Sequence, residues 1–208
     1  MYADYIFDLP AVEEEEIPYL RLLLSVLPSL GAGGRNYTDN LEYMMSYTGG
    51  VSTSCSLFVQ ATDSKKKNPA LHIRGKALSR HVSKLFSLMR DTIETPDFTD
   101  HKRLKELIEQ IWTGLQTKVS KNALRYGIQL SLSGYDEATY FGYHSSGIPY
   151  YHFIKSLVSD LNASIPKLAM NLSKLHKKLF SFHEPHLILT CDEKLFHSAR
   201  KEIEIFTG

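Results

Sequence analysis

The sequence has almost no excess charge and very few cysteines. Its 208 residues carry 24 Lys and Arg against 23 Asp and Glu, a formal net charge of +1 at pH 7. Such a neutral chain has no electrostatic reason to bind nucleic acid or an anionic membrane. Its two cysteines, Cys55 and Cys191, both fall in segments with a strand pattern. We expect them to be small buried thiols in a reducing compartment, because there are only two and both lie on predicted strands.

Long apolar runs and leader sequences are also missing. No run approaches the roughly 20 apolar residues that a membrane span needs. Met1 is followed at once by the alternation of a strand, without the basic region and apolar core of a secretory signal. We therefore expect neither a membrane span nor a signal peptide. So abrupt a start is expected of a segment that belongs to a longer polypeptide.

Motifs of zinc and serine hydrolases are absent. Neither H-x-x-E-H nor H-E-x-x-H occurs, and the serines after Gly50 lack the second glycine of G-x-S-x-G. The nearest approach to a zinc motif is His183-Glu184-Pro185-His186. Its proline excludes a regular helix interior, and no third ligand is identified. We therefore predict no catalytic residue, no metal ligand and no cofactor in this segment, and a loop at His183.

An aromatic stretch between Gly134 and Phe153 has two possible interpretations. It could form part of the core, or an apolar wall that grips unfolded peptide. A stacking platform for nucleic-acid bases needs Lys or Arg beside it, and none occurs between Tyr126 and Ile154. The aromatic residues are Tyr135, Tyr140, Phe141, Tyr143, Tyr150, Tyr151 and Phe153.

The stretch from residue 31 to 59 gives the clearest structural signals. Gly31, Gly33 and Gly34 end one helix, and Asn36 or Thr38 caps the next. Gly49 and Gly50 end that second helix, and at least one of them should have a positive φ. Gly31, Gly49 and Gly50 are thus the predicted structural residues. We expect a buried side of Leu41, Met44, Met45 and Thr48, followed by a strand with inward Val51, Thr53, Cys55, Leu57 and Val59 and outward Ser52, Ser54, Ser56 and Gln60.

The rest of the chain predicts further strands and a helical middle. Strands are expected at 3–9, 70–78 and 187–191, with Lys65, Lys66 and Lys67 in a solvated turn and a possible bulge at Gly75. A further strand is expected before Ala3, so that this edge is unpaired. The four acids Glu13–Glu16 are typical of the first turn of a helix.

Five more helices follow from apolar residues at 3.6-residue spacing. They run from His81 to Pro96, from Thr99 or Asp100 to Arg125 or beyond, over 154–161, from near Pro166, and after Asp192. The last of them carries Phe196, Ala199, Ile203 and Phe206. The prediction is an α+β fold, with an antiparallel sheet of about four strands packed against several helices. No linker interrupts it, so residues 1–208 are expected to form a single domain.

Several pieces of the sequence resemble one protein family. Leu30-Gly31 ends a leucine-rich helix, and Y-T-D, Y-T-G-G-V-S and a serine-rich strand follow in order. Further matching pieces are Phe7-Asp8-Leu9, I-R-G-K-A-L at 73–78 and S-G-Y-D from Ser133. Together they resemble the presequence-protease branch, which includes falcilysin, of the pitrilysin/insulinase zinc metallopeptidases. The resemblance is to the first segment of that family's second half, which lacks the metal site.

The resemblance implies a function for the segment. In that family two homologous halves enclose a chamber, and a zinc site in the first half cuts unfolded peptides. The segment would be part of the scaffold and of the chamber wall, and it would be inactive alone. Zinc would be bound by the other half of the protein. The partners of the segment would be the remaining domains of the same polypeptide and the unfolded peptide substrate. The assisting Arg and Tyr of the second half lie past this segment, so Arg125 and Tyr126 take no role. The compartment would be the cytoplasm in a bacterium, or the mitochondrial matrix or plastid in a eukaryote; the alternative function is an independent α+β protein-interaction module.

Overall fold

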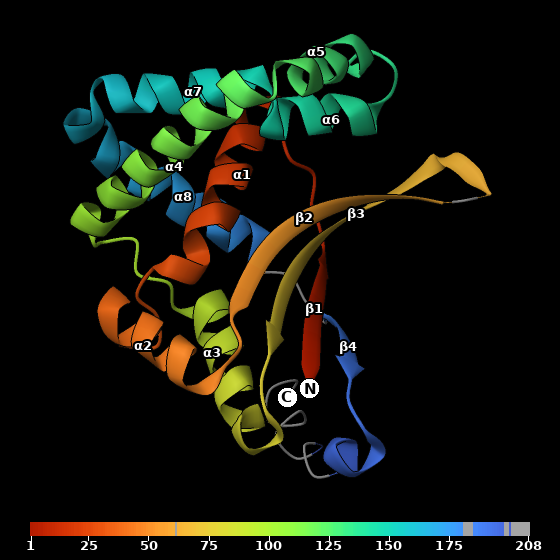
Figure 1. Ribbon diagram of the computed structural model, residues 1–208, viewed down its shortest axis with the longest axis vertical. Coiled ribbons are helices and arrows are strands. Elements are labelled where there is room, and N and C mark those ends of the chain that lie inside the picture. Colours follow the sequence, from red (N-terminus) through yellow and green to blue (C-terminus); the bar gives the residue numbers. More distant parts are fainter. Residues whose placement is uncertain (61, 181–184, 198–199, 201–208) are drawn as a thin grey trace. The chain divides into compact units, whose positions relative to one another are not determined.

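The computed structural model describes residues 1–60, 62–180, 185–197 and 200 (Figure 1). Its contacts group into two compact units. The first comprises Met1–Pro10, Leu27–Asp97 and the described part of Lys177–Gly208, and the second comprises Ala11–Val26 and Phe98–His176. A single domain over 1–208 stays a prediction.

The first unit contains a four-stranded antiparallel sheet. Its strands are β1 (Tyr2–Asp8), β2 (Val51–Gln60), β3 (Asp63–Lys76) and β4 (His186–Thr190), in the order β2-β3-β1-β4. The predicted antiparallel sheet and the α+β class are confirmed. β1 is an interior strand that pairs with β3 and β4, so the expectation that the strand at Ala3 has an unpaired edge was wrong. Within the described residues, the outer strands are β2 and β4.

The β2–β3 hairpin differs from the prediction at its tip. β3 begins at Asp63, so Lys65, Lys66 and Lys67 lie in a strand and not in a turn. The ladder continues this far because Lys67 pairs with Val59, and the register shifts only between Val59 and Gln60. The bulge expected at Gly75 is absent from this part of the ladder, since Gly75 pairs regularly with Ala3 and with Val51.

One face of the sheet packs on α3 (Val82–Glu94), which follows the short η3 (Ser79–His81) and lies beside β3 (Figure 1). The Tyr5 and Phe86 rings meet edge to face, with centroids 6.2 Å apart. Burial of aromatic and aliphatic side chains of this size is the main stabilising term of such a unit. The fully buried residues include Tyr5, Leu71, Ile73, Leu85, Leu88 and Met89.

Gly75 allows α3 to approach the sheet closely. A Cβ at this position would lie 2.6 Å from Leu85 Cδ1 and 3.2 Å from Met89 Sδ. Both of these side chains are fully buried and have little room to move. Close approach, and not a bulge, therefore explains this glycine in mid-strand.

The helix α2 (Tyr37–Tyr47) is capped as predicted but buries other residues than expected. The Asn36 side chain accepts a hydrogen bond from the Asp39 N–H at 3.0 Å. Met45 is 79% exposed, and Asn40 is the buried residue of the helix. The predicted apolar stripe was wrong at Met45, and the main contacts of α2 are with α3 and η2 (Leu27–Ser29).

The second unit is helical. It contains η1 (Glu14–Glu16), α1 (Ile17–Val26), α4 (His101–Lys121), α5 (Ala123–Leu132), α6 (Glu137–Ser146), α7 (Ile148–Ser159) and most of α8 (Leu161–Phe180). Asp100 caps α4 by accepting the Arg103 N–H at 2.9 Å, which confirms one of its two predicted starts. The buried residues include Leu20, Leu104, Ile108, Ile154, Leu168 and Leu172.

Three boundaries in this unit differ from the prediction. The aromatic stretch forms α6 and the first half of α7, because Asp136 and Thr139 make a capping box that starts a helix. The helix expected to continue to Arg125 is broken at Asn122 into α4 and α5. α8 begins well before Pro166, because the Asp160 carbonyl and carboxylate already accept the N–H groups of Ser164 and Ala163.

Asp192 caps the helical residues that follow β4, as predicted, by accepting the Leu195 N–H at 2.8 Å. The predicted positions Ala199, Ile203 and Phe206 lie outside the described residues. None of the described helices is both long and apolar enough to cross a membrane.

Two glycine substitutions should shift stability in opposite directions. Gly75→Val should lower the free energy of unfolding by about 1–3 kcal/mol, because the side chain would overpack the contact with Leu85. Gly114→Ala, at an open position in α4, should raise it by about 0.5–1 kcal/mol through helix propensity. Urea unfolding of both variants measures this. Equal stability of the Gly75 variant and the parent would show that α3 does not pack this closely.

Candidate functional site

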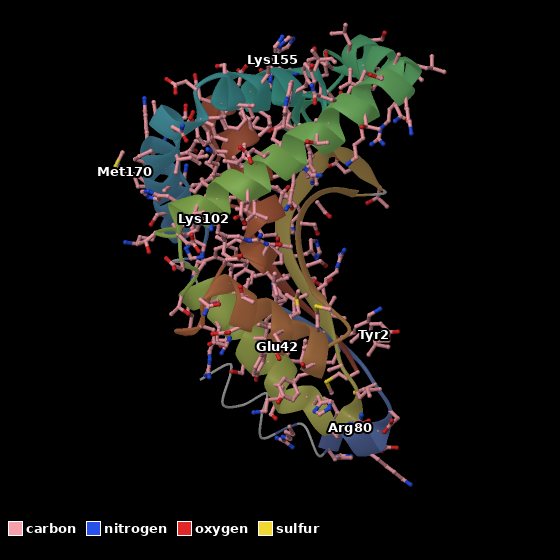
Figure 2. All side chains as sticks on the ribbon, turned by 60° about the vertical axis from the view of Figure 1, so that its left-hand side comes forward. Tyr2, Glu42, Arg80, Lys102, Lys155 and Met170 are labelled. Atoms are coloured by element: carbon pink, nitrogen blue, oxygen red, sulfur yellow. The ribbon has the colours of Figure 1, made fainter. Side chains whose placement is uncertain are left out.

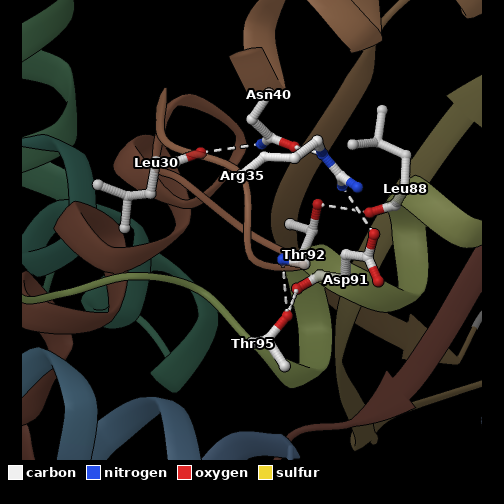
Figure 3. Close-up of polar contacts among 8 residues, drawn as sticks. Leu30, Arg35, Asn40, Leu88, Asp91, Thr92 and Thr95 are labelled. Atoms are coloured by element: carbon white, nitrogen blue, oxygen red, sulfur yellow. Dashed lines mark hydrogen bonds and ion pairs between the residues drawn. The ribbon is translucent and has the colours of Figure 1, made fainter. Parts of the chain in front are cut away.

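The loop before α2 is tied to α3 by a polar junction (Figure 3). Arg35 Nη2 forms an ion pair with Asp91 Oδ2 at 2.7 Å, and Arg35 Nε donates to Asn40 Oδ1 at 3.1 Å. Asn40 Nδ2 in turn donates to the Leu30 carbonyl at 2.9 Å. Asn40 is 3% exposed, so its amide is satisfied by groups of the loop instead of water.

The glycines of this loop are needed for its backbone path. The Gly31 carbonyl accepts the Asp97 N–H at 2.8 Å, and a Cβ on Gly31 would lie 2.7 Å from the Arg35 carbonyl oxygen. Gly33 has φ +61° and donates its N–H to Thr95 Oγ1 at 2.9 Å. These contacts show that the loop packs closely against the end of α3, and they assign no catalytic role to its glycines.

Gly49 and Gly50 join α2 to β2. Gly50 has φ +111°, which confirms the expected positive φ, and Thr48 ends α2 by donating its N–H to the Met44 carbonyl. Gly49 donates to the Lys76 carbonyl at 2.7 Å, which extends the pairing of β2 and β3 by one bond. A Cβ on Gly49 would lie 2.7 Å from Lys76 Cε, so the Lys76 stem packs over this glycine.

A second polar cluster lies on the sheet face opposite Tyr5. Asp4 Oδ2 accepts from Arg74 Nε at 2.8 Å and lies 3.1 Å from His72 Nδ1. The register also sets Ser54 opposite His72, so a serine, a histidine and an aspartate share three neighbouring strands. Two facts exclude nucleophilic catalysis at this place: Asp4 is already paired with Arg74, and His72 is 1% exposed. The cluster is a cross-strand contact.

Neither cysteine forms a disulfide. Burial raises the pKa of the Cys55 thiol to about 11, so Cys55 stays protonated and unreactive near neutral pH. Cys191 follows directly after β4. Both cysteines are only half-buried, so the prediction of fully buried thiols was wrong, and the raised pKa of Cys55 fits a structural thiol.

The described residues contain no group of three or more His, Cys, Asp or Glu that could hold a metal ion. His183 and Glu184, from the segment nearest to a zinc motif, lie outside the described residues, and His186 begins β4. The acids Glu13–Glu16 start a helix as predicted, with Glu13 and Glu16 forming a capping box. The part of the chain that the structure describes thus does not fit a zinc site.

The predicted aromatic segment divides into buried and exposed members. Tyr150 is 3% exposed, and the Phe153 ring packs on Tyr19 with centroids 4.7 Å apart. Trp112 and Tyr151 pair across α4 and α7 at 5.1 Å. Tyr135, at the other end, is 83% exposed. The core interpretation holds for the members on α7, and Tyr135 is available to solvent.

The family model described as peptidase M-16C associated matches residues 1–157. This chain belongs to that family. It is 25% identical over 178 residues to protein HypA of Clostridium perfringens and 24% identical over 180 residues to the mitochondrial presequence protease of Drosophila melanogaster. These alignments cover 82% and 86% of the chain but 18% and 17% of the relatives. This member of the peptidase-associated family thus spans about a fifth of the length of its curated relatives.

Solved structures share the fold at low sequence identity. A conserved protein from Enterococcus faecalis V583 matches 89% of this chain and 41% of its own, with a TM-score of 0.55 and 11% identity. The first half of the periplasmic protease PqqL from Escherichia coli matches 99% of this chain and 42% of its own, with a TM-score of 0.53 and 12% identity. The resemblance to the presequence-protease branch of the pitrilysin-like metallopeptidases is thereby confirmed, and the chain corresponds to the peptidase-associated region of presequence proteases.

Valine at either glycine after α2 should destabilise the protein. Gly50→Val should cost at least about 1 kcal/mol because a β-branched residue is strained at this φ, and Gly49→Val should cost a similar amount by displacing Lys76. Gly127→Val, at an open helical position in α5, is the control and should change stability by less than about 0.5 kcal/mol. Thermal or urea unfolding of the parent and the three variants measures these changes in stability. Parent-like stability of both variants at 49 and 50 would contradict their structural role.

Alkylation should reveal the protected thiol. In a Cys191→Ser variant, the rate of iodoacetamide reaction at Cys55 should rise with a midpoint near pH 11, because burial disfavours the thiolate. Since this pKa is raised on folding, the stability that Cys55 contributes is fully present below its unfolded pKa and is lost as the pH rises through its folded pKa. A reaction midpoint at or below pH 9 would show an accessible thiol.

Proposed function

We propose that this chain is a non-catalytic, chamber-forming segment of a zinc metallopeptidase that degrades unfolded peptides such as presequences. The observation that carries the proposal is the match of residues 1–157 to the peptidase-associated family, in relatives about five times as long. The relatives from Drosophila melanogaster and Arabidopsis thaliana are named presequence proteases.

The geometry supports a structural role. The glycines, the Arg35–Asp91 pair and the Asp4–Arg74 pair are all used in holding loops and strands together. Because the described residues do not fit a zinc site, we assign zinc to another part of the longer polypeptide. Its remaining domains and unfolded peptide are then the partners of this segment.

The names of the relatives also suggest a compartment. Presequence proteases of Drosophila and Arabidopsis are described as mitochondrial and chloroplastic/mitochondrial. We infer a reducing compartment for this chain, which agrees with two cysteines that form no disulfide. In a bacterium this would be the cytoplasm, and in a eukaryote the mitochondrial matrix or plastid.

An independent α+β protein-interaction module is the second candidate, because the chain forms compact units with their own buried cores. The coding sequence around this segment separates the two. An upstream H-x-x-E-H in the same reading frame supports the protease, and a stop codon directly before Met1 supports the module.

The isolated chain should neither retain zinc nor cleave peptide. After incubation with zinc and dialysis, elemental analysis should find well under one equivalent of metal, because no ligand set is present among the described residues. A fluorogenic unfolded peptide should remain intact in the presence of the chain. A purified zinc metallopeptidase of the pitrilysin type serves as the positive control. Stoichiometric zinc, or hydrolysis that a chelator stops, would contradict the proposed non-catalytic role.

A further inference from the structure

A cavity of about 500 Å³ lies in the first unit, where β1 begins and β3 ends. The C-terminal end of α2 and η3 complete its walls. Three large apolar side chains of these walls stay exposed: Tyr2 at 60%, Met45 at 79% and Leu78 at 62%. Figure 2 labels Tyr2 and Arg80, which both belong to this lining. Large apolar side chains gathered round one cavity mark a contact surface.

The charge of this cavity is of one sign. The cationic side chains of Lys76 and Arg80 contribute to its lining, and no Asp or Glu does. Within the described residues, neither Lys76 nor Arg80 has an acidic group at ion-pair distance. The nearby Glu42 of α2, labelled in Figure 2, is not part of the lining. A ligand that brings carboxylates would therefore meet cations that have no other acidic partner here.

The lining side chains are held in place by contacts of their own. Arg80 Nε donates to His81 Nε2 at 3.1 Å, which leaves the two terminal guanidinium nitrogens for a ligand. The His81 ring packs edge to face on Tyr47 with centroids 5.4 Å apart. The Lys76 stem lies over Gly49, which has no side chain to displace it. Such pre-positioned groups lose little entropy on binding.

We propose that this cavity is the docking site for an acidic, apolar segment of the same longer polypeptide. The assignment rests on the proposed function, because the relatives extend about fivefold beyond the region that this chain matches. Carboxylates of the segment would pair with Lys76 and Arg80, and its apolar side chains would cover Met45 and Leu78. Presequences are Arg-rich and poor in acids, so charge excludes them as the occupant. A small phosphate ligand would leave the apolar walls exposed.

Binding of defined peptides tests the chemistry of the site. The probe is a fluorescein-labelled hexapeptide of alternating Glu and Leu with a C-terminal amide, compared with peptides that carry Gln or Lys in place of Glu. Fluorescence anisotropy should show the Glu peptide binding at least about tenfold more tightly than the Gln peptide, and progressively less tightly with added salt. The Lys peptide should not bind. Equal binding of the Glu and Gln peptides, or displacement by millimolar inorganic phosphate, would overturn the proposal.

Variants place the binding at this cavity. Lys76→Glu with Arg80→Glu, and separately Met45→Ser with Leu78→Ser, should each weaken the Glu peptide at least about tenfold. Lys155→Glu with Lys174→Glu, at exposed positions in α7 and α8, is the matched control and should leave binding unchanged. Circular dichroism must show a parent-like fold for each variant. If either double variant of the cavity folds like the parent and still binds the Glu peptide with unchanged affinity, the peptide does not bind at this cavity and the proposal is wrong.

Overlapping 15-residue peptides from the rest of the encoded polypeptide identify the occupant. The peptide that binds should be rich in acidic and apolar residues and should lose affinity in the Lys76→Glu, Arg80→Glu variant. A coding sequence with an upstream H-x-x-E-H but no binding peptide would overturn the docking site and leave the proposed function standing. A bound Glu–Leu peptide together with a coding sequence of only these 208 residues would overturn the proposed function and the assignment of the occupant.

Discussion

The ion pair between Arg35 and Asp91 joins two parts of the first unit that are 56 residues apart in sequence. It holds the glycine loop before α2 against the last turns of α3, and α3 in turn packs on β3. Both side chains are largely withdrawn from solvent, with exposures of 24% and 18%, and the Arg35 guanidinium lies 4.6 Å from the centre of the Tyr43 ring. Loss of one partner would leave the other charge poorly solvated, which is more costly than loss of an exposed pair.

The placement of β1 imposes a second constraint. This strand lies between β3 and β4, so residues from the beginning and the end of the described chain meet in one sheet. Ala3, Tyr5 and Phe7 point to the buried face, and Asp4 points to the face that carries His72 and Arg74. The first unit therefore depends on long-range pairing, because its sheet forms only when β1 pairs with both β3 and β4.

Local signals in the sequence were sufficient for much of the fold. Alternation predicted β1 and β2, and caps at Asn36, Asp100 and Asp192 predicted three helix starts, because these signals act within a few residues. The capping box of Asp136 and Thr139 could have revealed α6, which the density of aromatic residues concealed. The same short-range chemistry predicts Gly31, Gly49 and Gly50 as structural residues.

Features made by distant residues could not be predicted in this way. The interior position of β1, the Arg35–Asp91 pair and the Asp4–Arg74 contact all join segments more than 50 residues apart. The cavity beside Lys76 combines three separate stretches of the sequence, none of which has a binding motif of its own. The family resemblance supplied the functional class, since composition and charge only excluded nucleic-acid and membrane binding.

The natural polypeptide that contains this segment provides the most direct test of its assignment to a zinc metallopeptidase. An antibody against these 208 residues should capture, from the cells that produce them, one polypeptide about five times as long, as its relatives are. Mass spectrometry should find an H-x-x-E-H motif in that polypeptide, and it should cleave an unfolded peptide until a chelator is added. A natural polypeptide that ends with these residues at both termini, with no metal-dependent peptidase activity, would contradict the assignment to a zinc metallopeptidase.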